Sequence, residues 1–230
     1  LTSWPQTQPR TSPVTTPGAG RAEPRASPLY FFGWPGDIGG AATRLAHLLP
    51  LLASRHPITV VPTSEGRLSE SKWTSILAKQ GIAFGKLADL PRQLDGWAVA
   101  LCNPRFFSSG AAAEARRRGL RIAWSNDMMW IFREEEGALI LGQVDTIIYV
   151  SEAQRRVLEP HYRRILLGRL SNPPGIPDPG APSGWIEGAG GRRVRWVMNG
   201  NYIDPSFFPM RPPRSEEHTS ELQSLAYLVC

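Results

Sequence analysis

An α/β fold built on a parallel sheet is predicted by three features of the sequence. Short apolar runs rich in β-branched and aromatic residues recur along the chain, as expected of strands that are buried on both faces. Between these runs lie segments whose apolar residues have helical spacing. The connections carry Gly, Pro, Asn and Ser, which are typical of turns. This repeated alternation indicates a parallel sheet with helices on both of its faces.

The expected strands are short, apolar and separated by turn residues. The first ends at Gly33, and the sixth is strongly β-branched. Because the strands are parallel, their carboxyl ends meet at one edge of the sheet, where ligands bind in folds of this kind. We expect strands at residues 29–32, 58–61, 82–84, 97–101, 121–124, 146–150 and 194–198.

Helices are expected between the strands, each with an identifiable start or stop. Proline inside a helix removes a hydrogen bond, so Pro50 should kink the first helix or divide it into two pieces, and Pro160 should stop the last one. Gly119 is expected just after the end of the third helix. We expect helices at residues 40–55, 73–80, 107–118, 134–143 and 152–158, and a Pro- and Gly-rich loop over residues 168–193.

The composition is that of a globular chain with one flexible end. The 230 residues are 41% hydrophobic and 20% charged, and this length allows one sizeable core. Residues 1–28 are rich in Pro, Thr, Ser and Arg and bury too little to offset their ordering entropy, so they are expected to be disordered. No run of eighteen apolar residues occurs, so no membrane-spanning helix is predicted.

The charge and the cysteine content narrow the class of partners. The net charge of +6 comes from arginines in short groups rather than one long basic tract, which does not predict nucleic-acid binding. Attraction to an anionic membrane surface is an alternative. Cys102 and Cys230 form no disulfide framework, and the four histidines form no cluster. These features predict a reducing, cytoplasmic setting and no metal site.

The C-terminal residues break with the rest of the chain. Residues 214–224 read RSEEHTSELQS, which matches the in-frame translation of a widely used sequencing-library adapter. We therefore expect residues 214–230 to be an artefact, the natural coding sequence to be interrupted near Pro213, and no function for His218 or Cys230. The alternative is a genuine amphipathic helix.

The first candidate site is the glycine-rich loop from Gly33 to Gly40, which follows the first strand. Its glycines allow close approach of a ligand to the backbone, and the following helix start offers free N–H groups to an anion, with Arg44 adding charge. The loop matches neither the dinucleotide fingerprint G-x-G-x-x-G nor the P-loop. A tight turn without a ligand is the alternative.

Polar residues follow two later strands. Ser125, Asn126 and Asp127 come directly after the fifth strand, and Asp127 has the chemistry of a general base or a hydroxyl ligand; a helix cap is the alternative. Ser151 is most simply a helix cap, which leaves Glu152 to face the cleft.

These motifs together resemble the GT-B glycosyltransferases, specifically the large retaining family 4. Gly39 and Gly40 with the Arg-bearing helix resemble the family's glycine-rich loop, and Val150-Ser151-Glu152 resembles its V-S step into a helix. Residues 201–209, NYIDPSFFP, resemble its N-G-V-D…F-x-P junction. The segment WSNDMMW at residues 124–130 departs from the commoner His of the acceptor-side loop.

The resemblance implies a Rossmann-like N-terminal domain over residues 29–211 and transfer of a sugar, of hexosyltransferase type, from a nucleotide-sugar donor. Gly39, Gly40 and Arg44 would lie on the donor diphosphate side. The acceptor, whether a sugar, a lipid-linked molecule or another compound, would meet Ser125, Asn126, Asp127, Ser151 and Glu152, with Asp127 as the candidate catalytic residue. No cofactor or metal is implied.

The resemblance also bears on what the chain does alone. In that family most donor contacts come from a second domain, so the present chain is expected to be inactive by itself, in the cytoplasm or at the inner face of the membrane. The competing hypothesis is a non-catalytic Rossmann-like module that binds a nucleotide or a sugar.

Overall fold

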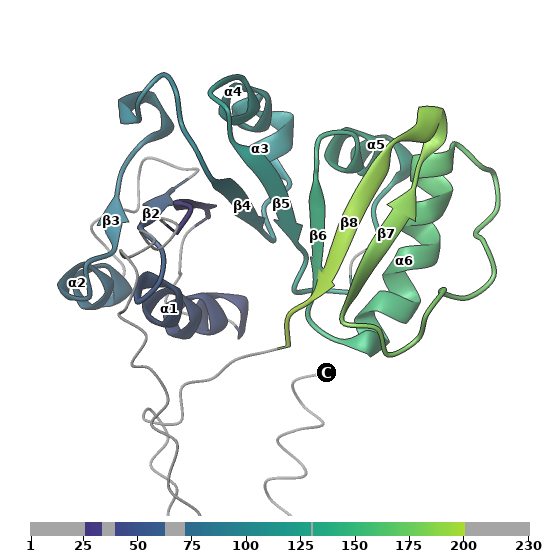
Figure 1. Ribbon diagram of the computed structural model, residues 1–230, viewed down its shortest axis with the longest axis horizontal. Helices are drawn as coiled ribbons and strands as arrows, with labels where there is room; N and C mark the ends of the chain where they lie inside the picture. Colours follow the sequence, from purple (N-terminus) through teal and green to yellow (C-terminus); the bar gives the residue numbers. More distant parts are fainter. Residues whose placement is uncertain (1–25, 34–39, 63–71, 130, 201–230) are drawn as a thin grey trace, which may run out of the picture.

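The sheet and its helices are seen in a computed structural model, which describes residues 26–33, 40–62, 72–129 and 131–200 (Figure 1). Within these residues one sheet has eight strands in the order β3-β2-β1-β4-β5-β6-β8-β7. Each neighbouring pair is parallel except β7 and β8, which are antiparallel. The chain therefore has a Rossmann-like α/β fold, as predicted.

The strands lie where the apolar runs predict them, with one addition. Their bounds are Leu29–Phe32 (β1), Ile58–Val61 (β2), Ala83–Phe84 (β3), Trp97–Leu101 (β4), Arg121–Ser125 (β5), Thr146–Tyr149 (β6), Ser183–Glu187 (β7) and Arg193–Met198 (β8). The addition is β7, which falls inside the segment predicted to be a loop.

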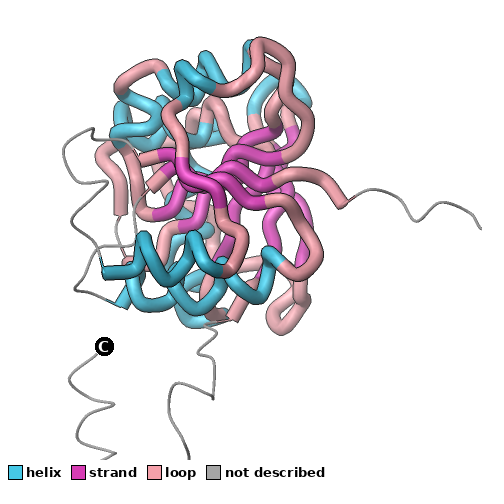
Figure 2. Tube along the Cα trace, turned by 90° about the vertical axis from the view of Figure 1, so that its left-hand side faces the viewer, coloured by secondary structure: helices cyan, strands magenta, loops and turns pink. Residues whose placement is uncertain are grey.

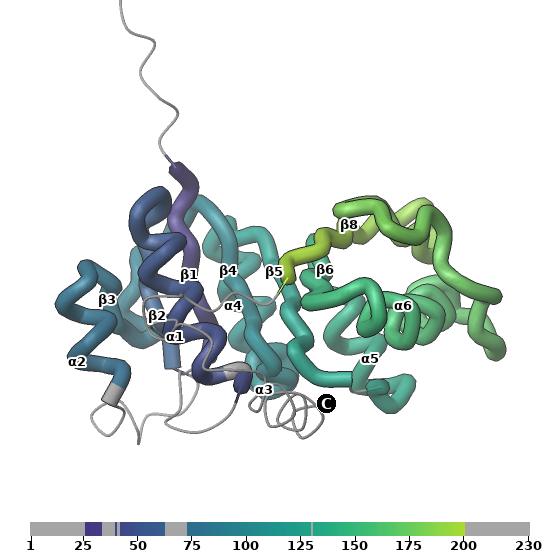
Figure 3. The backbone as a smooth tube through the Cα atoms, turned by 90° about the horizontal axis from the view of Figure 1, so that it is seen from below, coloured from purple at the N-terminus to yellow at the C-terminus, as the bar shows by residue number. Residues whose placement is uncertain are grey.

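The helices cover opposite faces of the two halves of the sheet. They are Gly40–Ala53 (α1), Lys72–Lys79 (α2), Arg105–Ser108 (α3), Ala111–Arg117 (α4), Glu134–Leu141 (α5) and Glu152–Leu167 (α6). Figures 1 and 2 show helices on both sides of the strands, and the view from below in Figure 3 shows α1 beside β1. Right-handed crossovers produce this division, because the chain moves along the sheet in one direction to β3 and in the other from β4 onward.

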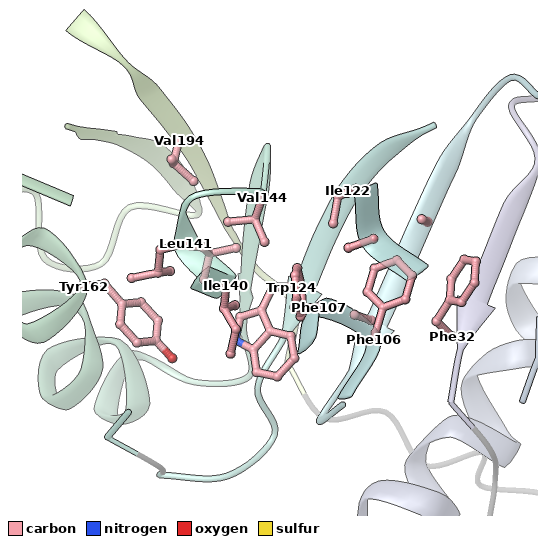
Figure 4. Packing of buried hydrophobic residues seen from close by; sticks show 14 of the residues in the cluster. Phe32, Phe106, Phe107, Ile122, Trp124, Ile140, Leu141, Val144, Tyr162 and Val194 are labelled. Carbon is pink, nitrogen blue, oxygen red and sulfur yellow. The ribbon is translucent and has the colours of Figure 1, made fainter. Parts of the chain in front are cut away.

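Two hydrophobic clusters correspond to the two faces. The cluster under α1 and α2 includes Phe31, Val60 and Val99. The larger cluster lies under α3 to α6 and includes a chain of aromatic rings that is visible in Figure 4. In this chain neighbouring ring centroids are 4.3–5.9 Å apart, in the order Phe32, Phe106, Phe107, Trp124, Phe132 and Tyr162. Such ring pairs add stability beyond their buried area.

The helical prolines do not end or divide their helices as expected. Pro50 does not split α1, which is a single 14-residue helix, and Pro160 does not stop α6, which continues to Leu167. Each proline removes one backbone hydrogen bond. In α6 this loss is offset by burial of Tyr162 and Leu166 beyond the proline, because packing of the apolar face dominates helix stability in proteins. The helix ends at Gly168, which has a left-handed φ of 62°.

Two further expectations need correction. The helix expected over residues 107–118 is two helices, α3 and α4, which are divided at Gly110 with φ 83°. The loop expected over residues 168–193 contains β7, because Ile186 alternates inward and is fully buried while its neighbours face outward. The segments 1–25 and 201–230, and with them the disorder, junction and artefact expectations for those residues, lie outside the described part.

Within the described segments no helix combines the length and the apolar character needed to cross a membrane.

Candidate functional site

The carboxyl ends of β1 and β4 form the switch point of the sheet, because the chain runs in opposite directions on either side of them. Crevices at such points are the usual ligand sites of open α/β sheets. Asn103, just after β4, donates from Nδ2 to the carbonyl oxygen of Phe32 at the end of β1, over 3.2 Å. The two strand ends are thereby tied together at the base of the crevice.

Arg44 and Asp127 form a buried ion pair beside the switch point. The guanidinium comes from the second turn of α1, and the carboxylate follows β5 by two residues. Only 7% of the Arg44 side chain and 6% of the Asp127 side chain are exposed. Ser125 joins them, since its hydroxyl donates to Asp127 Oδ1 over 2.9 Å. Removal of either member of a charge pair buried in this way would leave an uncompensated charge, which is strongly destabilising.

One polar atom of each residue in this pair has no hydrogen-bond partner among the described residues. Asp127 Oδ2 and Arg44 Nε are buried and have no hydrogen-bond partner among the described residues. Buried polar atoms are nearly always paired with protein or water. The pair therefore presents one unfilled acceptor and one unfilled donor in the same place.

Cys102 fixes the backbone of the Asp127 loop. Its amide donates to the carbonyl of Ser125 over 2.8 Å, and its Sγ accepts from the amide of Asp127 over 3.0 Å. Its φ of 46° is left-handed, which is uncommon for a residue with a side chain. Burial, and next the Asp127 carboxylate, raise the pKa of the thiol to about 11. Cys102 is therefore a neutral thiol near pH 7 and acts as a structural contact.

Asn126 faces the opposite side of the same loop. Its Nδ2 donates to Tyr162 Oη over 3.3 Å, and its Oδ1 accepts from the amide of Met128 over 3.2 Å. This turn contact shows that the polar run caps a turn rather than a helix, since α5 begins only at Glu134. Burial raises the pKa of Tyr162 to about 12, so its hydroxyl stays protonated.

Gln154 joins the Asp127 loop to the start of α6. Its Nε2 donates to the carbonyls of Asn126 and Met128, and its Oε1 accepts from the amide of Val150 over 2.9 Å. Its own amide donates to Ser151 Oγ over 3.1 Å. Both polar atoms of the buried Gln154 side chain bond backbone groups. Gln154 therefore joins the segment after β5 to the segment after β6.

Ser151 and Glu152 occupy the helix start that follows β6. Ser151 is the N-cap of α6, as predicted. Glu152 accepts from the amide of Gly180 over 3.2 Å and lies near Arg155 and Arg156. Gly40 is the exposed first residue of α1, and Gly39 lies outside the described residues.

The structure thus brings Arg44 to Ser125 and Asp127, and connects Ser151 to the Asn126 backbone through Gln154. Sequence patterns did not single out Cys102 or Gln154. Ser151 and Gln154 do form a local S-x-x-Q capping pattern. The contacts of Cys102 with Asp127 and of Gln154 with Asn126 and Met128 have no local signal, because these partners lie 25 or more residues apart.

An apolar cavity of about 270 Å³ adjoins the ion pair. It lies between one side of α1 and the face of the sheet that α1 covers. Arg44 and Ser125 stand at its polar end. The other polar residues of the lining are Thr146, Arg195 and Asn199. The apolar residues of the lining are Leu29, Phe31, Leu48, Leu52, Trp97, Val99, Leu101, Ala123, Ile148 and Val197.

Metal ligands are not gathered at this site. Across the described segments no group of three or more His, Cys, Asp or Glu side chains is placed to hold a metal ion. The polar groups of the site are one guanidinium, one carboxylate, a hydroxyl and amides, which suit hydroxyl-bearing ligands.

Comparison with known proteins gives only a distant likeness in structure. No protein-family profile matches the chain, and no curated protein sequence matches it. Among solved structures it is similar to HepE of Anabaena in complex with UDP-glucose, with 12% identity, a TM-score of 0.49, and coverage of 88% of this chain and 50% of that chain. The complex of HepE with UDP and glucose gives the same identity and TM-score, with 51% of that chain covered. The chain therefore spans about half the length of these structures, and the functional assignment depends on the residues of the site.

Proposed function

We propose that the chain forms the acceptor-side half of a glycosyltransferase that uses a nucleotide-sugar donor. The observation that supports this is the meeting of Arg44 and Asp127 at the switch point of a Rossmann-like sheet. Ligands of such sheets bind in this crevice. Of the motifs that resemble family 4 glycosyltransferases, Val150-Ser151-Glu152 directly follows β6 at the same edge of the sheet. The whole enzyme would complete the crevice with a second domain.

Asp127 is the candidate acceptor residue. Its Oδ1 is occupied by Arg44 and Ser125, whereas its Oδ2 has no partner among the described residues. An acceptor hydroxyl that donates to Oδ2 would be oriented, and its oxygen made more nucleophilic, by the carboxylate. Orientation of this kind accounts for a large share of catalysis in many enzymes.

Arg44 takes a different role from the diphosphate ligand suggested by the family resemblance. Its guanidinium is buried against Asp127 and Ser125, so we propose that it positions the carboxylate. The donor diphosphate would instead meet the exposed helix start at Gly40, where free backbone N–H groups favour an anion.

Binding of a simple acceptor tests this assignment. Saturation-transfer NMR with methyl β-D-glucopyranoside and related methyl glycosides should detect binding to the 230-residue protein, and Asp127→Asn should weaken it by about tenfold or more. The matched control is Glu187→Gln, which neutralises an exposed carboxylate on β7. Equal binding by wild type and Asp127→Asn would show that Asp127 does not contact the acceptor.

Transfer itself provides the second test. The 230-residue chain, incubated with radiolabelled nucleotide sugars and the same glycosides, is expected to form no product, because most donor contacts would come from the second domain. Product formed by this chain alone would contradict the half-enzyme assignment.

A further inference from the structure

The cavity beside Arg44 has two chemically different ends. Three rows of side chains cross the sheet beneath it, as the strand register shows. Leu101, Ser125, Ile148 and Val197 form the row at the carboxyl edge. Phe31, Val99, Ala123, Thr146 and Arg195 form the middle row, and Leu29 and Trp97 form the third. Polar contacts concentrate at the carboxyl edge, where Arg44 meets Ser125, and the apolar surface extends from there along the strands.

The wall of the cavity is one stripe of α1. Arg44, Leu48 and Leu52 are four residues apart and therefore lie on one side of the helix. Ala123 is small and lies opposite them in the middle row, which leaves space above the central strand. The result is an apolar channel that begins at the ion pair and follows the strands.

The polar end of the cavity has one hydrogen-bond donor and one acceptor that lack partners among the described residues. Arg44, which is 6% exposed and lines the cavity, has an unpartnered Nε among the described residues, and Asp127 Oδ2 beside it is unpartnered in the same sense. A hydroxyl group both donates and accepts, so a single hydroxyl satisfies both atoms. The rest of the lining is apolar apart from Thr146, Arg195 and Asn199, so it favours a group without polar atoms, since a buried polar group without a partner is costly.

We propose that this cavity is a subsite for an amphiphilic acceptor, a glycoside or alcohol with a hydrocarbon tail. Its hydroxyl-bearing head meets Arg44 and Asp127, and its tail lies between α1 and the sheet. This inference rests on the proposed function, because it specifies the class of acceptor at the same site. Sites of this composition, mostly apolar with a few convergent polar groups, are typical of small-molecule binding.

Calorimetric titration of the 230-residue protein tests the subsite with two probes that share one head group. Octyl β-D-glucopyranoside, kept below its critical micelle concentration, carries a tail, and methyl β-D-glucopyranoside does not. We expect the octyl glycoside to bind at least about tenfold more tightly, because each methylene removed from water favours binding. Similar affinities for the two probes would overturn the tail subsite while leaving the proposed function, which concerns the head, untouched.

Two variants on one helix separate the cavity from the rest of the surface. Leu52→Trp narrows the cavity, whereas Leu51→Trp alters an exposed neighbour, 47% exposed, that does not line it. We expect Leu52→Trp to lose the advantage of the octyl probe and Leu51→Trp to keep it. If circular dichroism shows that Leu52→Trp is unfolded, Val197→Phe narrows the same cavity from β8.

Other occupants of the cavity give distinct results. If the octyl glycoside still binds more tightly than the methyl glycoside in both Leu52→Trp and Val197→Phe, its tail lies elsewhere and the proposal is overturned. Octyl binding that appears only in a variant ending at Gly200 would show that the chain's own following residues occupy the cavity, and would also overturn it.

Discussion

The guanidinium of Arg155 lies 3.5 Å from the centroid of the Trp196 indole ring. Arg155 is on α6 and Trp196 is on β8, so the contact joins the last helix to the sheet. The same guanidinium donates to Glu159 over 2.6 Å and to the carbonyls of Pro177 and Asp178. Arg155 and Glu159 are both fully buried, and the connection before β7 is held against α6 by these bonds.

Replacement of Arg155 by Met should therefore destabilise the protein strongly. Glu159 would stay buried with Arg163 as its remaining ionic partner, and loss of one member of a buried pair typically costs about 3–5 kcal/mol. Urea denaturation followed by circular dichroism measures the change. Arg156→Met, on the same helix with a side chain 62% exposed, should change the free energy of unfolding by less than about 1 kcal/mol.

Gly96 cannot accept a side chain. It has φ 104°, and a Cβ there would lie 2.1 Å from the carbonyl oxygen of Pro28. Gly96→Ala should cost at least about 3 kcal/mol, because backbone displacement adds to the left-handed strain. Gly110 also has a positive φ, 83°, but open space around its Cβ position, so Gly110→Ala should cost only about 1 kcal/mol. Equal costs in thermal or urea unfolding would contradict the steric argument.

Gln154 is expected to hold the Asp127 loop. Gln154→Leu removes the donor to the carbonyls of Asn126 and Met128 and the acceptor from Val150, with an expected loss of about 1–3 kcal/mol. Hydrogen exchange should show faster exchange at the amide of Val150. Gln143→Leu is the control, since Gln143 is half-buried and, among the described residues, its Nε2 donates to the carbonyl of Leu139 at the end of the adjacent α5. Unchanged exchange at Val150 in Gln154→Leu would argue against the loop connection.

The Cys102 thiol should react slowly with iodoacetamide. Burial, followed by the Asp127 carboxylate, raises its pKa from 9.0 to about 11. At pH 8 its thiolate fraction is then about 100-fold lower than that of an unperturbed thiol, and the rate falls with it. Because the folded-state pKa is the higher one, the protonated thiol favours the folded state below pH 9, and this contribution is lost as the pH rises through about 11.

The measurement uses Cys230→Ser, so that Cys102 is the remaining thiol, and follows alkylation by mass spectrometry between pH 7 and 11. The rate should rise about tenfold per pH unit up to about pH 11, whereas the rate of an unperturbed thiol would level off above pH 9. Rapid alkylation at pH 7.5 would contradict a raised pKa.

Strand positions were largely predictable from sequence because they depend on local composition. β1, β2 and β4 match the expected residues throughout, since each is an uninterrupted apolar run bounded by Gly, Pro or Asn. β7 was missed because only Ile186 of its five residues is buried. α6 extends beyond Pro160 because of tertiary burial, which a local rule for proline does not include.

The sequence predicted candidate residues for the site, but not the contacts between them. Strand ends predict that Ser125, Asn126 and Asp127 lie at the carboxyl end of β5, but pairing of Arg44 with Asp127 joins residues 83 apart. The left-handed conformation of Cys102 and the contacts of Gln154 with the carbonyls of Asn126 and Met128 also depend on packing between distant segments. Such contacts follow from the assembled sheet, and a single sequence contains no periodic signal for them.

The two outer strands of the sheet have a consequence for association between molecules. β3 has two residues, and β7 has five, preceded by Pro182 and ending at the charged Glu187. Short edge strands that are flanked by proline or a charged residue offer few free N–H and C=O groups for pairing with a strand of another chain. Molecules of this protein are therefore poorly suited to joining sheet to sheet, and concentrated solutions of it should resist fibril formation by that route.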